Sequence, residues 1–133
     1  FGLTVTADIA EDEFDPSDAE AVVFPGGMPG AANLAASKTV KSAVAFALEH
    51  NRIIGAECAA PGVVLAGTGA LSGKRYTCFP GFEVPEGVYT AAAAERDGNL
   101  VTGNGPAAAE KFAAVLAGAI SPKAGKHIEE MYK

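Results

Sequence analysis

The residues whose types and spacing are best suited to chemistry surround Cys58, within positions 55–66. The apolar run 52–56 predicts a strand that turns directly into a helix beginning near Ala60, with Pro61 in its first turn. Alanines stand two positions before and two positions after the cysteine, as small residues do in sharp turns that raise a nucleophile above a strand. The start of a helix also favours a thiolate through its free N–H groups and its dipole. We therefore predict a reactive thiol at Cys58; a buried cysteine that only packs is the alternative.

Two backbone N–H groups are candidates to stabilise negative charge beside that thiol. Ala59 directly follows the cysteine, and Gly27 lies in the glycine-rich loop 25–30 after a short apolar run. Together these N–H groups form a predicted oxyanion site. Glu57 adjoins Cys58, but neighbouring residues of a strand point to opposite faces, which favours a structural role for this carboxylate.

No general base for the thiol is evident in the sequence. The only histidines, His50 and His127, fall on predicted helices away from the strand end, and both are predicted to be surface residues. Residue 59 is alanine, so no histidine follows the cysteine directly. A cysteine-protease triad is therefore not encoded, and activation must come from the helix terminus, a carboxylate or a group outside this chain.

Composition and charge narrow the class of protein. The chain has 133 residues, of which 49% are hydrophobic and 16 are glycine, which predicts one compact α/β domain, residues 1–133. Its net charge of −6 disfavours nucleic acid and anionic membranes as partners. The two cysteines form no metal or disulfide motif, so we expect a reducing cytoplasm and neither metal nor cofactor. No apolar run is long enough to span a membrane.

Alternating strand and helix patterns position these residues. We expect strands at 3–8, 21–24, 52–56 and 75–78, an acidic loop before residue 21, a hairpin of 91–96 and 99–102, and helices at 38–50, 60–66, 106–120 and 122–132. This order predicts a mostly parallel sheet with helices on both faces, whose ligands bind at the carboxyl ends of the strands. Four such strand ends, at 24–27, 56–58, 77–80 and 102–106, contain the glycine-, proline- and cysteine-rich stretches of the chain. The predicted pocket lining is Gly26, Met28, Phe79 and Pro106.

Four motifs in order resemble the ThiJ/PfpI superfamily. They are Pro25-Gly26-Gly27 after an apolar strand, Ala56-Glu57-Cys58-Ala59-Ala60-Pro61, Thr77-Cys78-Phe79-Pro80-Gly81-Phe82-Glu83 and Asp97-Gly98-Asn99-Leu100-Val101-Thr102. The resemblance is to the branch of the parkinsonism-associated protein deglycase and its bacterial relatives. It implies a flavodoxin-like three-layer sandwich, a homodimer, Cys58 as the reactive residue, and Gly27 and Ala59 as oxyanion donors.

The chain also departs from the pattern of that superfamily. Phe79 stands where a member of the family carries histidine, Met28 replaces a common polar residue, and Gly103-Asn104 replaces a common Ser-Arg pair. The family's first strand–helix–strand unit, with the glutamate that pairs with the thiol, precedes the position of Phe1. We therefore expect a separate peptide or another protomer to supply this unit.

Without that unit, one further expectation concerns the strands that remain. Val22, Val23, Ile53 and Ile54 would face open sheet edges.

The resemblance implies a function at the level of a substrate class. We expect cysteine-dependent action on small reactive carbonyls, as a glyoxalase or protein deglycase, together with a redox-protective role. A non-catalytic oxidative-stress sensor or chaperone that uses the same cysteine is the first alternative, and a PfpI-type intracellular peptidase or amidase is the second. The physiological substrate stays open.

Overall fold

A computed structural model describes residues 2–133; Phe1, with which the chain opens, lies outside them. Its main sheet has four strands, β1 (Ala21–Phe24), β2 (Ile53–Glu57), β6 (Leu100–Gly103) and β5 (Ala94–Asp97), in the order β1-β2-β6-β5. The first three run parallel, and β5 is antiparallel to β6. The predicted mostly parallel sheet and the hairpin around Asp97-Gly98 are both confirmed.

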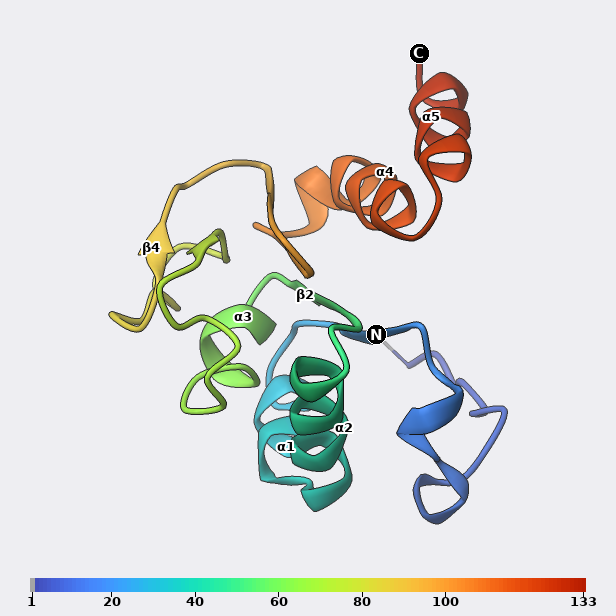
Figure 1. The fold of residues 1–133 in the computed structure, drawn as a ribbon, viewed down its shortest axis with the longest axis vertical. Helices are drawn as coiled ribbons and strands as arrows, with labels where there is room; N and C mark the ends of the chain where they lie inside the picture. The colour runs from blue at the N-terminus through green and yellow to red at the C-terminus, as the bar shows by residue number, and fades with distance from the viewer. Residues whose placement is uncertain (1) are drawn as a thin grey trace.

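Helices cover both faces of this sheet, which gives the predicted three-layer arrangement (Figure 1). Helices α1 (Gly30–Ala36) and α2 (Lys38–Glu49) lie on one side, and α4 (Ala109–Ile120) lies on the other. Helix α5 (Pro122–Met131) packs mainly on α4. Three short 3-10 helices, η1 (Glu11–Glu13), η2 (Pro16–Asp18) and η3 (Pro106–Ala108), lie in the connections.

Helix α2 illustrates how sequence pattern becomes packing. The Ser37 hydroxyl accepts a hydrogen bond from the Val40 N–H at 3.2 Å, which caps the first turn as expected. Ala43, Val44 and Ala47 repeat at helical spacing and are buried against the sheet. This face and the side chains of Val22, Phe24, Ile54 and Ala56 form one continuous core.

Several expected elements differ from the observed ones. Residues 3–8 form no strand, and Leu3 and Val5 are each 88% exposed. Alternating residues make a strand only where a neighbour completes the hydrogen-bond ladder, and no described strand lies beside them. The acidic loop contains η1 and η2, and α1 follows the glycine-rich loop 25–30 in a stretch for which no helix was predicted.

Two corrections concern the strands nearest the candidate site. β2 lies between β1 and β6, so Ile53 and Ile54 do not face a sheet edge. Val22 is also buried, which leaves Val23 as the half-exposed side chain of that group. The strand expected at 75–78 is only β3 (Arg75–Tyr76), which pairs with β4 (Val88–Tyr89) in a separate small sheet.

None of the helices in residues 2–133 combines the length and the apolar character that crossing a bilayer requires.

Candidate functional site

Cys58 lies in a sharp turn between β2 and α3 (Ala60–Val63). Its φ is +60°, in the left-handed region that non-glycine residues rarely adopt and that is enriched at functional sites. The Cys58 N–H donates to the Gly103 carbonyl at 2.9 Å, and the Cys58 carbonyl accepts from the Phe79 N–H at 2.8 Å. The turn is therefore held by β6 on one side and by the segment after β3 on the other.

The helix after this turn is shorter than expected. It ends at Val63 rather than near residue 66. A Cβ on Gly62 would lie only 1.7 Å from the Phe82 carbonyl oxygen, so the segment after Phe79 presses directly on this helix. Its packing against that segment, rather than its length, fixes the turn that carries Cys58.

The glycine-rich loop after β1 packs directly on the turn. A Cβ on Gly26 would lie 2.5 Å from the Cys58 Cβ, 2.7 Å from the Glu57 carbonyl oxygen and 3.0 Å from the Ala59 nitrogen. Only glycine permits this approach. Gly27 follows with a φ of +86° and with open space where a Cβ would project.

Both predicted oxyanion donors lie at this junction of loop and turn. Within residues 2–133, neither the Gly27 N–H nor the Ala59 N–H donates a hydrogen bond to a protein acceptor. Two such groups beside a nucleophile are the kind of donors that stabilise a developing negative charge. The chemistry that this arrangement permits is therefore attack by sulfur on a polarised carbonyl carbon.

Among the predicted pocket residues, Phe79 lies beside Gly105, as the sulfur of Cys58 does. A Cβ on Gly105 would be 3.1 Å from Phe79 Cδ2 and 4.0 Å from Cys58 Sγ. Met28 and Pro106 have exposed side chains on the loops that contain Gly27 and Gly105. Gly105 itself was missed by the sequence analysis, although the Gly-Asn-Gly-Pro run around it was a signal.

A buried threonine pair, also missed from sequence, holds the Phe79 segment in place. The Thr77 N–H donates to Thr102 Oγ1 at 2.9 Å, and Thr77 Oγ1 donates to the Ala92 carbonyl at 2.7 Å. Both threonines are fully buried. These bonds anchor residues 77–79 to the end of β6, beside the Gly103 carbonyl that holds Cys58.

The two cysteines have different surroundings. Cys78 is fully buried in the core, and burial, with smaller contributions from Glu83 and Cys58, raises its pKa to about 11. Cys58 is only partly buried. Cys58 is therefore the thiol that a reagent in solution can reach.

The carboxyl group of Glu57 is partly buried and, within residues 2–133, lacks a hydrogen-bond partner at one oxygen. Its Oε1 is buried without a hydrogen-bond partner among the described residues, and burial raises the pKa of this carboxyl. Gly55, two residues earlier on β2, faces Phe112 and Leu116 of α4, so strand alternation puts Glu57 on that same face.

The histidines are remote from this site, as predicted. His50 is exposed at the carboxyl end of α2, where Nδ1 lies 3.0 Å from the Phe46 carbonyl and the ring stacks on Phe46. His127 is exposed on α5. In the part of the chain that the structure describes, no cluster of three or more His, Cys, Asp or Glu side chains could hold a metal ion.

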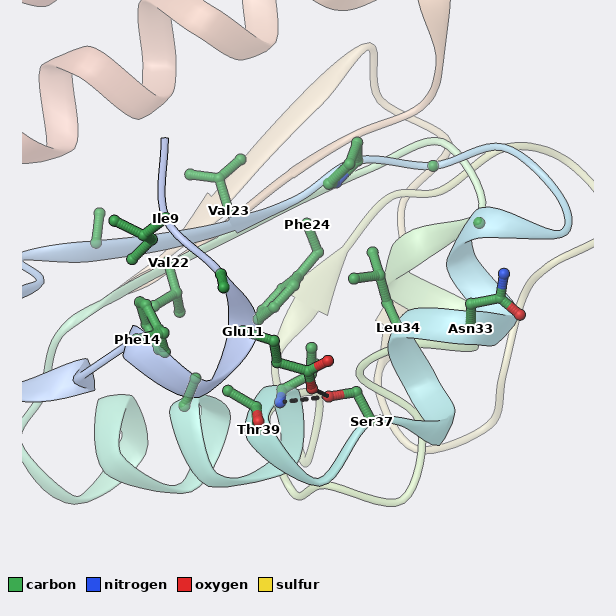
Figure 2. Close-up of a pocket in the computed structure, with 17 residues that line it drawn as sticks. Ile9, Glu11, Phe14, Val22, Val23, Phe24, Asn33, Leu34, Ser37 and Thr39 are labelled. Carbon is green, nitrogen blue, oxygen red and sulfur yellow. Dashed lines mark hydrogen bonds between the residues drawn. The ribbon is translucent and has the colours of Figure 1, made fainter. Parts of the chain in front are cut away.

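A cavity that is distinct from the thiol site adjoins it. It has a volume of about 750 Å³ and runs along β1 between the N-terminal segment and α2 (Figure 2). Its lining does not include Cys58. It reaches Gly26, however, whose backbone lies against the cysteine, so the cavity and the thiol are separated only by the glycine-rich loop.

The sequence of this chain is similar to those of several known proteins. The model of the DJ-1/PfpI family matches residues 1–119. Protein DJ-1 homolog B of Arabidopsis thaliana is 32% identical over 116 residues, which cover 86% of this chain and 26% of the relative. Protein dj-1beta of Drosophila melanogaster is 33% identical over 135 residues, which cover 98% of this chain and 67% of the relative. The chain therefore spans only about a quarter of the length of the plant relative.

Solved structures agree with the sequence comparison. A cysteine-to-alanine mutant of a DJ-1 superfamily protein from Salmonella typhimurium superposes with a TM-score of 0.76 at 37% identity, covering 85% of this chain and 64% of that one. DJ-1beta of Drosophila melanogaster superposes with a TM-score of 0.79 at 31% identity, covering 88% and 66%. From its motifs, its fold and these relatives, the chain belongs to the DJ-1/PfpI family.

Proposed function

We propose that this DJ-1-like protein acts through Cys58 on small reactive carbonyl compounds, in the manner of a glyoxalase or protein deglycase. The observation that carries the proposal is the strained turn of Cys58, fixed by two backbone hydrogen bonds and packed against Gly26. Strain at a partly exposed nucleophile, beside two N–H groups without protein acceptors, is typical of a site built for reaction.

The proposed chemistry begins with addition. The Cys58 thiolate attacks the aldehyde carbon and forms a carbon–sulfur bond, while the carbonyl π electrons move onto oxygen. The N–H groups of Gly27 and Ala59 stabilise this oxyanion, which then takes a proton and becomes a thiohemiacetal. Phe79 and Gly105 limit the space beside the sulfur, which favours substrates of few atoms.

Turnover of methylglyoxal by matched cysteine variants tests the proposal. We expect Cys58→Ser to lose turnover and Cys78→Ser to keep it, provided that both variants retain the far-UV circular dichroism of the parent protein. Turnover that survives in Cys58→Ser would exclude Cys58 as the nucleophile. A parent protein that does not consume methylglyoxal, although its Cys58 is reactive, would exclude the carbonyl substrate.

A redox sensor that uses the same cysteine is the second candidate function. The N–H groups that favour an oxyanion also favour a sulfenate or sulfinate on Cys58. This supports a sensor function, which requires no carbonyl substrate. Oxidation of Cys58 by mild peroxide, with no carbonyl turnover, would favour the redox sensor over the enzyme.

The family resemblance is also the basis for proposing a homodimer, which light scattering would test. Two unpaired cysteines fit a reducing compartment, and we propose the cytoplasm.

A further inference from the structure

We propose that Asn104 is a site of spontaneous deamidation, and that the carboxylate formed there slows the reaction of the Cys58 thiol. Deamidation at this position does not require the proposed carbonyl chemistry. The support comes from the Asn104-Gly105 dipeptide, from its place between two contacts to Cys58, and from the charges of the surrounding segments.

Asn104-Gly105 is the only asparagine–glycine pair in the sequence. In such a pair the glycine nitrogen can approach the asparagine side-chain carbonyl with little hindrance, because glycine has no Cβ. Gly105 also has a φ of +145°, which glycine adopts far more readily than other residues, so the fold itself requires glycine after Asn104. Within residues 2–133, the Gly105 N–H donates to no backbone acceptor, which leaves this nitrogen available to react.

The reaction needs no reagent other than water. The Gly105 nitrogen loses its proton and bonds to the side-chain carbonyl carbon of Asn104, and the side-chain amide leaves as ammonia. Water then opens the resulting succinimide ring at either carbonyl. One opening gives aspartate, and the other gives isoaspartate, whose backbone is longer by one CH2 group. Both products have a carboxylate that is ionised at neutral pH, where the chain had a neutral amide.

Both neighbours of Asn104 contact Cys58. The Gly103 carbonyl accepts a hydrogen bond from the Cys58 N–H at 2.9 Å, and a Cβ on Gly105 would lie 4.0 Å from Cys58 Sγ. The Asn104 N–H donates to the Ala93 carbonyl at 3.0 Å. Strand β6, which leads into the dipeptide, lies between β2 and β5 and is therefore held on both sides. A carboxylate at position 104 is thus fixed within one residue of the contacts to the thiol.

The segments around Cys58 contain no positive charge that would neutralise such a carboxylate. Lys, Arg and His are all absent from segments 25–30, 57–63, 77–83 and 103–108. Their titratable groups other than Cys58 are Glu57, Cys78 and Glu83. An additional negative charge disfavours the thiolate and so lowers the fraction of Cys58 that can react near neutral pH.

The isoaspartyl product has a second effect. A Cβ on Gly105 would already lie 3.1 Å from Phe79 Cδ2, so the loop has little room for a longer backbone. The extra CH2 group must therefore shift Gly105 relative to the sulfur. Because the carboxylate has the same charge in both products, we expect both to react more slowly than the amide form.

Ageing of the intact protein tests the modification. After incubation at mildly alkaline pH, peptide mapping by mass spectrometry should find aspartate and isoaspartate at position 104. Asn99 is the internal control, because its carboxamide donates to the Arg52 carbonyl at 2.9 Å and accepts from Lys74 Nζ at 2.5 Å. It is also followed by leucine. We expect several-fold more conversion at Asn104; an Asn104 amide that persists as long as that of Asn99 would overturn the proposal.

The rate of Cys58 alkylation in the separated forms tests the consequence. Anion exchange isolates the deamidated fraction, and iodoacetamide then measures the rate across pH. We expect this fraction to react about threefold more slowly near neutral pH, as for a charge several ångströms away. Its half-maximal rate should occur at a higher pH, and the difference should shrink in high salt.

Two variants reproduce the comparison without ageing. Asn104→Asp has the charge of the product, and Asn104→Gln is the neutral control of similar polarity. We expect the first to react like the deamidated fraction and the second like the parent protein. Equal rates for the amide and deamidated forms, or an equal loss in both variants, would overturn the proposal. Neither measurement uses a carbonyl substrate, so the result is independent of the proposed function.

Discussion

At the scale of single residues, the turn at Cys58 is defined by what its neighbours exclude. Gly26 has no room for a Cβ beside Cys58, and Gly62 has none beside the Phe82 carbonyl. The conformation of Cys58 itself, with a φ of +60°, is costly for a residue with a side chain. Glycines at these two close contacts therefore help to maintain a geometry that the cysteine alone would not adopt.

The first prediction concerns the reactivity of the two thiols. Iodoacetamide near neutral pH should modify Cys58 much faster than Cys78, because Cys78 is fully buried and its pKa is raised to about 11. Peptide mapping by mass spectrometry at timed intervals measures both rates. Equal rates in the folded protein would contradict the assignment, and equal rates in denaturant provide the control.

A second prediction concerns the loop that packs on the turn. Gly26→Ala places a Cβ within 3.0 Å of three atoms of residues 57–59, so we expect a loss of about 1–3 kcal/mol in the free energy of unfolding and a change in Cys58 alkylation. Gly30→Ala is the matched control, because a Cβ there meets nothing within 4 Å. Denaturant unfolding of both variants gives the comparison; a stable, normally reactive Gly26→Ala would refute the close packing.

The carboxyl of Glu57 predicts a pH dependence of stability. Burial raises its folded pKa above the ordinary value of 4.5, so its stabilising contribution is present below that value and is lost as pH rises through the folded pKa. Glu57→Gln should therefore gain stability relative to the parent protein as pH rises above 4.5. Thermal midpoints across this range test it.

At the scale of elements, the sequence correctly predicted those features that depend only on residues close together in the chain. The cap at Ser37, the apolar stripe of α2 and the Asp97-Gly98 hairpin all form where expected. The segment 3–8 does not form a strand, because pairing depends on a neighbour that no local pattern specifies. Helix α1 was missed because its run of alanines after Gly30 shows no amphipathic periodicity, and α3 is short because Phe82 packs against it.

In the candidate site, too, the sequence revealed the residues marked by local pattern but not those that depend on contacts distant in the chain. Cys58, Gly26 and Phe79 were identified from the sequence because small residues and strand ends mark them. Gly105 and the Thr77–Thr102 hydrogen bond were not, because they depend on how residues 75–79 lie against β6. The cavity along β1 was not foreseen either, since it is enclosed by an acidic segment that was interpreted only as a solvated loop.

The contact between α4 and α5 predicts opposite effects of two similar substitutions. A Cβ on Gly125 would lie 2.6 Å from the Gly118 Cα, whereas one on Gly118 would meet its nearest atom at 3.7 Å. Gly125→Ala should therefore release α5, while Gly118→Ala should stabilise α4 by about 1 kcal/mol through helix propensity. Limited proteolysis within α5 should accelerate only in Gly125→Ala. Equal cleavage of both variants would mean that the two helices do not pack closely.

At the scale of the whole molecule, net charge opposes self-association through the outer edge of β1, which no strand within residues 2–133 covers. The chain has a charge of −6 at pH 7 and a sequence pI of about 4.8. The repulsion that keeps β1 edges apart should fade as pH falls toward that value. We expect light scattering to report growing aggregates near the pI.

Lysine at the edge tests whether β1 is the surface responsible. Val23→Lys should suppress the aggregation, because charged side chains protect edge strands. Val88→Lys, on the separate small sheet and 57% exposed, should not. Aggregation that both variants reduce equally would point to charge alone rather than to the β1 edge.

The hydrogen bond from the Phe79 N–H to the Cys58 carbonyl, 2.8 Å long, makes the Phe79 amide a spectroscopic reporter. An amide proton is sensitive to the length of its hydrogen bond, and this one ends on the backbone of the reactive residue. A nitrogen–proton correlation spectrum would therefore register adduct formation or oxidation at Cys58 as a displacement of the Phe79 amide resonance. The chain thus contains a built-in probe of its own thiol that requires no added label on sulfur.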